Sequence, residues 1–189
     1  MTTTLQRLEE LEFVVRACQS LLPQISTAGD LIVKCLNDGH TLFACGNGGS
    51  ACDALHLVEE LVGRYRTNRR ALPAICLNAD PAILTCISND WDYASIFSRQ
   101  LEALARKGDL LVTFSSSGNS QNLLHALAVA DHQQMPTLSL LGKDGGTIAG
   151  KSTSEIIIPS QNTARIQEMH TWILHELLEQ VEARVENLT

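Results

Sequence analysis

The sequence predicts an α/β fold: a doubly wound parallel sheet of five strands, flanked by helices and preceded by an N-terminal helical extension. Five short apolar runs alternate with segments of helical periodicity, and this order is typical of a parallel sheet, because each helix returns the chain to the same end. Two of the runs lead directly into polar turns that open helices. Ligands of such sheets bind beyond the carboxyl ends of the strands, where both turns belong.

Length and composition predict one globular domain comprising residues 1–189. A formal charge of −7 and the lack of a basic block argue against direct nucleic-acid binding. No apolar run reaches membrane-spanning length and no signal-peptide pattern opens the chain, so we expect a cytoplasmic protein without a membrane partner. The six cysteines form no CxxC pair and lie mostly in apolar stretches, which favours buried thiols over disulfides.

Residues 1–38 are predicted to form two helices. Leu5 to Leu22 carries a helical stripe of apolar residues, with glutamates and arginines between them. Pro23 predicts a break, and a second helix follows from about Gln24 to Asn37, where Asp38-Gly39 ends it. The stripe of the first helix has no partner of its own, so we expect it to pack on another subunit.

The stretch from Thr41 to Tyr65 combines a strand, a glycine-rich turn and a helix. Thr41 to Cys45 is a short apolar run that predicts a buried strand. The turn Gly46-Asn47-Gly48-Gly49 follows, and Ser50 is a good helix N-cap. Glycines let a ligand approach the backbone closely, and the free N–H groups of a first helical turn attract anions. The combination indicates a site for a small phosphorylated molecule.

His56 and Glu60 lie four residues apart on this predicted helix and therefore share one face. They could supply a metal ligand and a carboxylate, although such a pair more often lies on an ordinary surface. The turn lacks the Gly-Lys-Ser/Thr of a P-loop and the GxGxxG spacing of a dinucleotide site. Because glycine-rich turns are common in α/β proteins, these residues alone leave both interpretations open.

The segment after this helix is predicted to contain one strand and two helices. Ala71 to Leu77 has the pattern of a second buried strand. Turn residues 78–81 open a short helix, Ala82 to Ile87, which Ser88-Asn89-Asp90 is expected to interrupt. A further helix is predicted from about Tyr93 to Arg106.

The third predicted strand, Asp109 to Phe114, runs into a turn that contains four serines, Ser115 to Ser120. A helix follows over residues 121–131. Hydroxyl groups and backbone N–H groups at a helix N-terminus suit phosphate oxygens, which accept several hydrogen bonds at once. An ordinary serine-rich loop is the alternative, but such loops rarely lie so tightly between an apolar strand and a helix. The turn therefore favours a phosphate site.

Two more strands, Pro136 to Leu141 and Glu155 to Ile158, precede a long helix from about Thr163 to Glu186. Gln167 and His175 on this helix are two turns apart and face roughly one side. A lone helix histidine is more often a surface or capping residue than a functional one. The inward stripe is predicted to comprise Ile166, Met169, Ile173, Leu177 and Val181.

Five motifs are distributed along the chain: GNGGSACDALHLVEELVGRYR, SND, SSSGNS, LLGKDGG and ARIQEMHTWILHELLEQVE. In order and spacing, from about Leu31 to Val181, they closely resemble the sugar isomerase (SIS) domain of the bacterial phosphoheptose isomerases. The resemblance implies a flavodoxin-like three-layer sandwich. It also implies an aldose–ketose isomerase that interconverts sedoheptulose 7-phosphate and D-glycero-D-manno-heptose 7-phosphate. Family members are homotetramers whose sites draw on neighbouring subunits.

The resemblance assigns roles to individual positions. The acid/base pair of the family corresponds to Glu60 and His175. Some members hold one zinc ion per subunit, and its ligands correspond to His56, Glu60, Gln167 and His175. The substrate-binding positions correspond to Asn47, Gly48, Gly49, Glu60, Asn89, Asp90, Ser115, Ser116, Ser117, Ser120 and Gln167, with the four serines forming the phosphate cradle.

One position departs from the family pattern and keeps two alternatives open. Ala164 stands where the enzymes often carry an acidic residue, and SQNTARIQEMH also resembles a non-enzymatic SIS-domain protein that binds the replication initiator DnaA. That relative lacks the matching glutamate and has asparagine in place of His175, whereas this chain retains both. A regulatory sugar-phosphate sensor would keep the serine turn and need no acid or base. The sequence also leaves open whether the product feeds lipopolysaccharide, capsule or another glycan.

Overall fold

The computed structural model describes residues 3–185 and has a parallel sheet in the order β2-β1-β3-β4-β5. Every neighbouring pair of strands is parallel, which confirms the predicted doubly wound fold. This strand order is the flavodoxin-like one. The strands are β1 Leu42–Gly46, β2 Ala74–Cys76, β3 Leu110–Ser115, β4 Thr137–Gly142 and β5 Ser154–Ile158.

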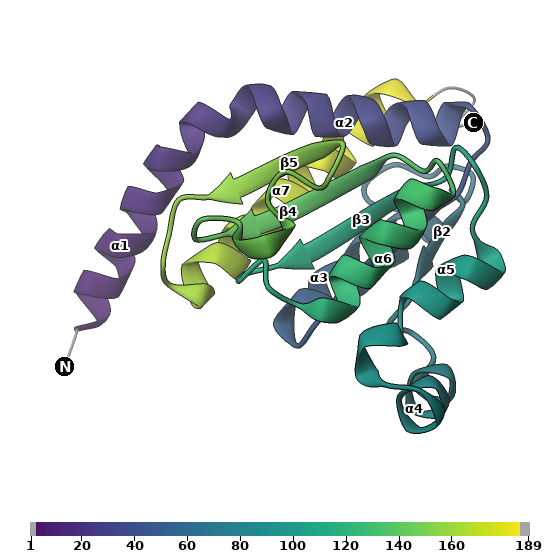
Figure 1. The fold of residues 1–189 in the computed structure, drawn as a ribbon. Coiled ribbons are helices and arrows are strands. Elements are labelled where there is room, and N and C mark those ends of the chain that lie inside the picture. Colours follow the sequence, from purple (N-terminus) through teal and green to yellow (C-terminus); the bar gives the residue numbers. More distant parts are fainter. Residues whose placement is uncertain (1–2, 186–189) are drawn as a thin grey trace.

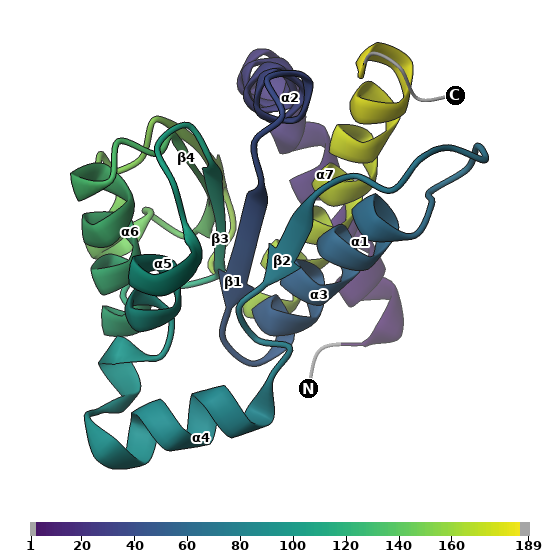
Figure 2. The ribbon, with the colours of Figure 1, turned by 90° about the vertical axis from the view of Figure 1, so that its right-hand side faces the viewer.

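Helices cover both faces of the sheet and make a three-layer sandwich (Figure 2). On one face lie α1, α2, α3 and α7, and on the other lie α5 and α6. The helices are α1 Thr4–Ala17, η1 Cys18–Leu21, α2 Leu22–Asn37, α3 Gly49–Val62, α4 Pro81–Asp90, η2 Tyr93–Ser95, α5 Ser98–Leu104, α6 Gln121–His132, η3 Gly146–Ile148 and α7 Thr163–Arg184.

The two faces of the sheet contribute to two separate cores, because successive side chains of a strand point to opposite sides. On β1, Leu42 and Ala44 pack with α2, α3 and α7, whereas Phe43 and Cys45 pack with α5 and α6. The predicted inward stripe of α7 is confirmed, since its five residues are all buried: Ile166, Met169, Ile173, Leu177 and Val181.

The N-terminal helices form one bent arm rather than two helices separated by a break at Pro23 (Figure 1). Pro23 lies in the first turn of α2, where a missing N–H leaves no helical hydrogen bond unmade, so the predicted break at this residue is wrong. The arm bends instead at η1. The first helix, α1, extends away from the sheet and exposes large apolar side chains, namely Leu5, Leu8, Phe13 and Val15.

Three predicted boundaries are wrong around the second strand. β2 has only three residues, Ala74–Cys76, and lies at the edge of the sheet. The helix α4 continues through Ser88–Asp90, because exposed polar residues are tolerated in a last turn, and it ends at Asp90. The helix expected over residues 93–106 is two pieces, η2 and α5, separated by the buried Ile96 and Phe97.

Three further observations concern the cysteines, the hydrophobicity of the helices and the end of α7. All six cysteines are free thiols; Cys52 and Cys86 are exposed and the other four are buried. Among residues 3–185 we find no helix with the length and hydrophobicity needed to cross a bilayer. α7 ends at Arg184, short of the predicted end at residue 186, which lies outside the described residues.

Candidate active site

The two polar turns predicted from the sequence lie side by side at the carboxyl edge of the sheet. β1 and β3 are adjacent, with Gly46 opposite Phe114, and each strand runs into a turn that opens a helix. The chain passes from β1 to β2 on one side of β1, and from β2 it returns to β3 on the other side of β1, so the turns after β1 and β3 flank the topological switch point. Ligands of doubly wound sheets bind at this point.

The turn between β1 and α3 depends on glycine at two positions. Gly48 has φ +58°, a left-handed conformation that costs a non-glycine residue free energy. At Gly49, a Cβ atom would lie 2.4 Å from Nε2 of Gln167, so the absence of a side chain lets Gln167 of α7 pack against the backbone. The structure thus places Gln167 beside Gly49, in the turn that also contains Asn47 and Gly48.

The serine turn uses its hydroxyl groups in two ways. Ser115 is buried and its Oγ accepts a hydrogen bond of 3.0 Å from the N–H of Gly118, so this serine shapes the turn. Ser117 Oγ accepts from the N–H of Asn119 at 3.3 Å. Ser120 precedes α6 but makes no side-chain cap to that helix. Its hydroxyl therefore remains available at a helix N-terminus, where an anion is favoured.

Replacing Gly118 by alanine should destabilise the fold more than an ordinary glycine substitution. Gly118 has φ +64°, and its Cβ would lie 1.8 Å from the carbonyl oxygen of Gly145, which is backbone and cannot rotate away. Left-handed strain and overpacking together predict a loss of about 2–4 kcal/mol in the free energy of unfolding. Urea unfolding measures it.

Gly39→Ala is the matched control for this substitution. Gly39 also has a positive φ, +80°, but its Cβ would meet nothing within 4 Å. It should lose only the strain of about 1–2 kcal/mol. Equal losses in the two variants would contradict the steric account of Gly118.

The helices α3 and α7 bring three predicted active-site residues together. Nε2 of His56 lies 3.5 Å from Oε1 of Glu60. The rings of His56 and His175 meet edge to face, with centroids 5.0 Å apart. The ring of Tyr65 stacks on that of His175, with 5.9 Å between centroids. The side chains of His56 and Glu60 are 32% and 18% exposed, so both are partly desolvated and yet reachable by a ligand.

The donor atoms at this interface suit a divalent metal such as zinc. Two imidazoles and one carboxylate converge there, and nitrogen and oxygen donors of this kind bind zinc. Glu59 also lies near, because one ligand atom each of His56, Glu59 and Glu60 fall within 4.8 Å of one another. Glu59 is exposed, however, whereas Glu60 is partly buried. The fourth predicted ligand, Gln167, lies beside Gly49 at the start of α3.

Asp53 and Thr171 are residues of this interface that the sequence analysis missed. The hydroxyl of Thr171 donates a 2.8 Å hydrogen bond to Oδ1 of Asp53 and so joins α7 to α3. Asp53 is 7% exposed, and its Oδ2 has no hydrogen-bond partner within the described chain. Burial raises the pKa of this carboxyl, against the opposing effects of Thr171 and His56. Helical spacing could have identified Asp53, which lies three residues before His56.

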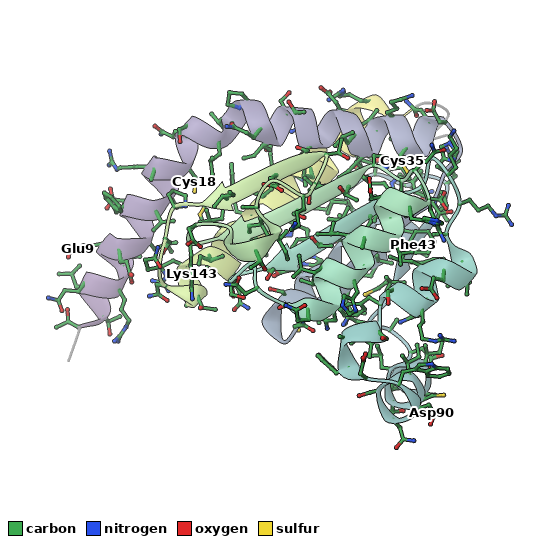
Figure 3. The ribbon with its side chains drawn as sticks, viewed as in Figure 1. Glu9, Cys18, Cys35, Phe43, Asp90 and Lys143 are labelled. Carbon is green, nitrogen blue, oxygen red and sulfur yellow. The ribbon has the colours of Figure 1, made fainter. Side chains whose placement is uncertain are left out.

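Asn89 and Asp90 do not join the α3–α7 interface within the chain described. They are the exposed last residues of α4, and Nδ2 of Asn89 donates to Oδ1 of Asp90 at 2.8 Å. Figure 3 shows Asp90 on α4, away from the sheet. Their predicted role in substrate binding is taken up below as a proposal.

Asn47 instead meets two residues that the sequence analysis did not single out, Tyr93 and Asn122. The hydroxyl of Tyr93 donates to Oδ1 of Asn47 at 2.9 Å. Asn47 and Asn122 exchange hydrogen bonds of 2.9 and 2.8 Å between their side-chain amides. No local pattern signals these contacts, because the three residues come from separate segments.

Comparison with known proteins shows the family of this chain. The family model of the SIS domain matches residues 9–142. The phosphoheptose isomerase of Geotalea daltonii is 50% identical over 167 residues, which are 88% of this chain and 87% of that protein. A solved phosphoheptose isomerase from Francisella tularensis superposes with a TM-score of 0.87 at 31% identity, over 96% of this chain and all of the other. That from Neisseria gonorrhoeae gives 0.84 at 36% identity, over 95% of this chain and all of the other. The chain therefore belongs to the phosphoheptose isomerase family of SIS-domain proteins.

Proposed function

We propose that the protein is a phosphoheptose isomerase, which interconverts sedoheptulose 7-phosphate and D-glycero-D-manno-heptose 7-phosphate through an enediol. The observation that carries the proposal is the meeting of Glu60, His56 and His175 between α3 and α7, next to two turns suited to a sugar phosphate. The chain's 50% identity to a phosphoheptose isomerase supports the same reaction.

The serine turn is proposed to bind the phosphate. Ser116, Ser117 and Ser120 would donate their hydroxyl groups, together with the N-terminus of α6, while Ser115 holds the turn in shape. Asn47, Gly48 and Gly49 in the neighbouring turn would contact the sugar chain. Binding energy from the phosphate, remote from the reacting carbons, would then hold the open-chain sugar in position.

Glu60 and His175 are proposed to move the protons. Isomerisation of the ketose removes a proton from C1 and delivers one to C2, and the carboxylate of Glu60 can take the first and return it at the second. His175 would give a proton to the carbonyl oxygen O2 and accept the one from O1, since imidazole exchanges protons near neutral pH. Tyr65, stacked on His175, would hold the ring in place.

His56, Glu60, Gln167 and His175 are proposed as the ligands of one zinc ion per subunit. Their mixed nitrogen and oxygen donors fit this metal, although glutamine is an uncommon ligand. When bound, zinc would polarise the carbonyl group and stabilise negative charge on the enediolate. We also place the enzyme in the cytoplasm.

A homotetramer is the proposed assembly, with active sites at subunit interfaces. The arm exposes apolar side chains, and a cavity of about 410 Å³ between α1 and α7 continues this surface. Its lining is mostly apolar: Leu11, Val15, Cys18, Leu22, Met169 and Trp172, with Gln19 and Glu168. Asn89 and Asp90, exposed at the end of α4, would contact substrate in the assembled site.

Incubation with sedoheptulose 7-phosphate in heavy water, followed by NMR, tests the reaction. We expect an aldoheptose 7-phosphate that carries deuterium at C2. Saturable binding without conversion, with and without added zinc, would contradict the isomerase and favour a sugar-phosphate sensor. If the protein neither converts nor binds the sugar phosphate, a partner-binding protein of the DnaA-associated type is favoured.

A further inference from the structure

Three segments that are distant in sequence meet at the side chain of Asn47. Asn47 belongs to the turn between β1 and α3, Asn122 to the first turn of α6, and Tyr93 to η2. The hydrogen bonds among them measure 2.9 Å from Tyr93 to Asn47, and 2.9 and 2.8 Å between the two amides. We propose that Tyr93 and Asn122 are positioning residues, which orient the Asn47 amide so that it donates a hydrogen bond to the sugar.

These hydrogen bonds leave one donor of the Asn47 side chain free. Oδ1 of Asn47 accepts from both Tyr93 and Asn122, which occupies the two lone pairs of an amide oxygen. Nδ2 of Asn47 donates one of its two hydrogens to Asn122. One N–H remains, so the Asn47 side chain can meet a ligand only as a donor. It thus suits a hydroxyl or carbonyl oxygen of a sugar.

Asn122 and Tyr93 differ in burial, and therefore hold Asn47 in different ways. Asn122 is 2% exposed, so it is a fixed point within the fold. It lies two residues after Ser120, and therefore ties the Asn47 turn to the helix that begins at the serine turn. Tyr93 is 59% exposed, and its hydroxyl approaches Asn47 from the rim, while the following Ile96 and Phe97 are buried and anchor its segment.

Through these contacts, the hydroxyl group of Tyr93 is expected to affect substrate affinity. This hydroxyl donates to Oδ1 of Asn47 and, together with the paired amide of Asn122, restrains the Asn47 amide in the orientation that leaves one N–H free. The inference rests on the proposed function, because the sugar is taken to lie against the Asn47 turn and the phosphate against the serine turn. The hydroxyl should therefore matter for the sugar and not for the phosphate.

Tyr93→Phe removes this hydroxyl and keeps the ring. We expect the KM for sedoheptulose 7-phosphate to rise about two- to tenfold, the effect of one net hydrogen bond. We expect kcat to change less than about twofold on the same basis. Competitive inhibition by inorganic phosphate should keep its inhibition constant. Thermal unfolding should also be unchanged, since the Tyr93 ring is largely exposed.

Thr85→Val is the matched control, because it also removes a hydroxyl from an exposed residue. Thr85 lies in α4, the helix that precedes η2. Within residues 3–185, the Thr85 hydroxyl donates only to carbonyl groups of α4, those of Pro81 and Ala82, at 2.7 and 3.2 Å. This variant should leave both KM and the phosphate inhibition constant at the wild-type values.

The outcomes separate the inference from the proposed function. If the wild-type protein does not convert the substrate, the proposed function fails, whatever Tyr93→Phe does. If the wild type is active and Tyr93→Phe has the wild-type KM, the positioning role fails. If KM and the phosphate inhibition constant rise by the same factor, Tyr93 supports the whole edge of the sheet and does not orient Asn47, and the inference is again overturned.

Discussion

Glu60→Gln is expected to lower kcat for isomerisation by about 100- to 10,000-fold, the range that a general base contributes. Glutamine keeps the size and the hydrogen-bonding reach of the side chain but cannot accept a proton from carbon. Glu60 contacts His56 at the edge of the α3–α7 interface and its side chain is not deeply buried, so the fold should tolerate the change. The affinity for inorganic phosphate should also persist, because the serine turn is formed by other residues.

The test measures two quantities: the turnover rate, and the rate at which the C1 proton of the substrate exchanges with deuterium from heavy water. Loss of both in Glu60→Gln, with normal thermal unfolding, would agree with Glu60 as the base. Glu59→Gln is the discriminating comparison, since Glu59 is adjacent and belongs to the same group of possible ligands. A rate that survives Glu60→Gln but is lost in Glu59→Gln would transfer the role to Glu59.

His175→Asn is expected to lower kcat by a similar factor of about 100 to 10,000, because asparagine cannot exchange protons near neutral pH. The imidazole of His175 contacts the rings of both His56 and Tyr65. His132→Asn is the control: His132 is exposed at the end of α6 and should be replaceable without loss of rate.

Zinc content separates the two roles proposed for His175. After incubation with the metal, we expect about one zinc per subunit in the wild type and a reduced content in His175→Asn, because one of four ligands is removed. A variant with full zinc content and lost turnover would keep the proton-transfer role and reject the ligand role. Normal turnover in His175→Asn would contradict both.

Local patterns in the sequence suffice for the sheet and its two turns. Each strand of a buried parallel sheet is a short apolar run, and such runs are visible without any knowledge of tertiary contacts. The serine turn likewise lies wholly between one strand and one helix. Its position at the carboxyl edge follows from the fold class, since all parallel strands end at the same edge.

Local patterns were insufficient where packing decides the conformation. Ser88–Asp90 have the composition of a turn, yet they complete α4, because nothing in the exposed last turn opposes a helix. Residues 93–106 have helical periodicity, yet Ile96 and Phe97 are drawn into the core between η2 and α5. At Ile96 and Phe97, tertiary burial rather than propensity set the boundary.

By itself, the sequence determined the fold class, the two turns and the pairing of His56 with Glu60, because four residues on one helix place two side chains on one face. Only the tertiary structure decided that His175 lies against His56, that Thr171 bonds Asp53, and that Tyr93 and Asn122 hold Asn47. These contacts join segments far apart in the chain. Their formation depends on how α3 packs on α7 and how η2 and α6 meet the edge of the sheet, which no local spacing specifies.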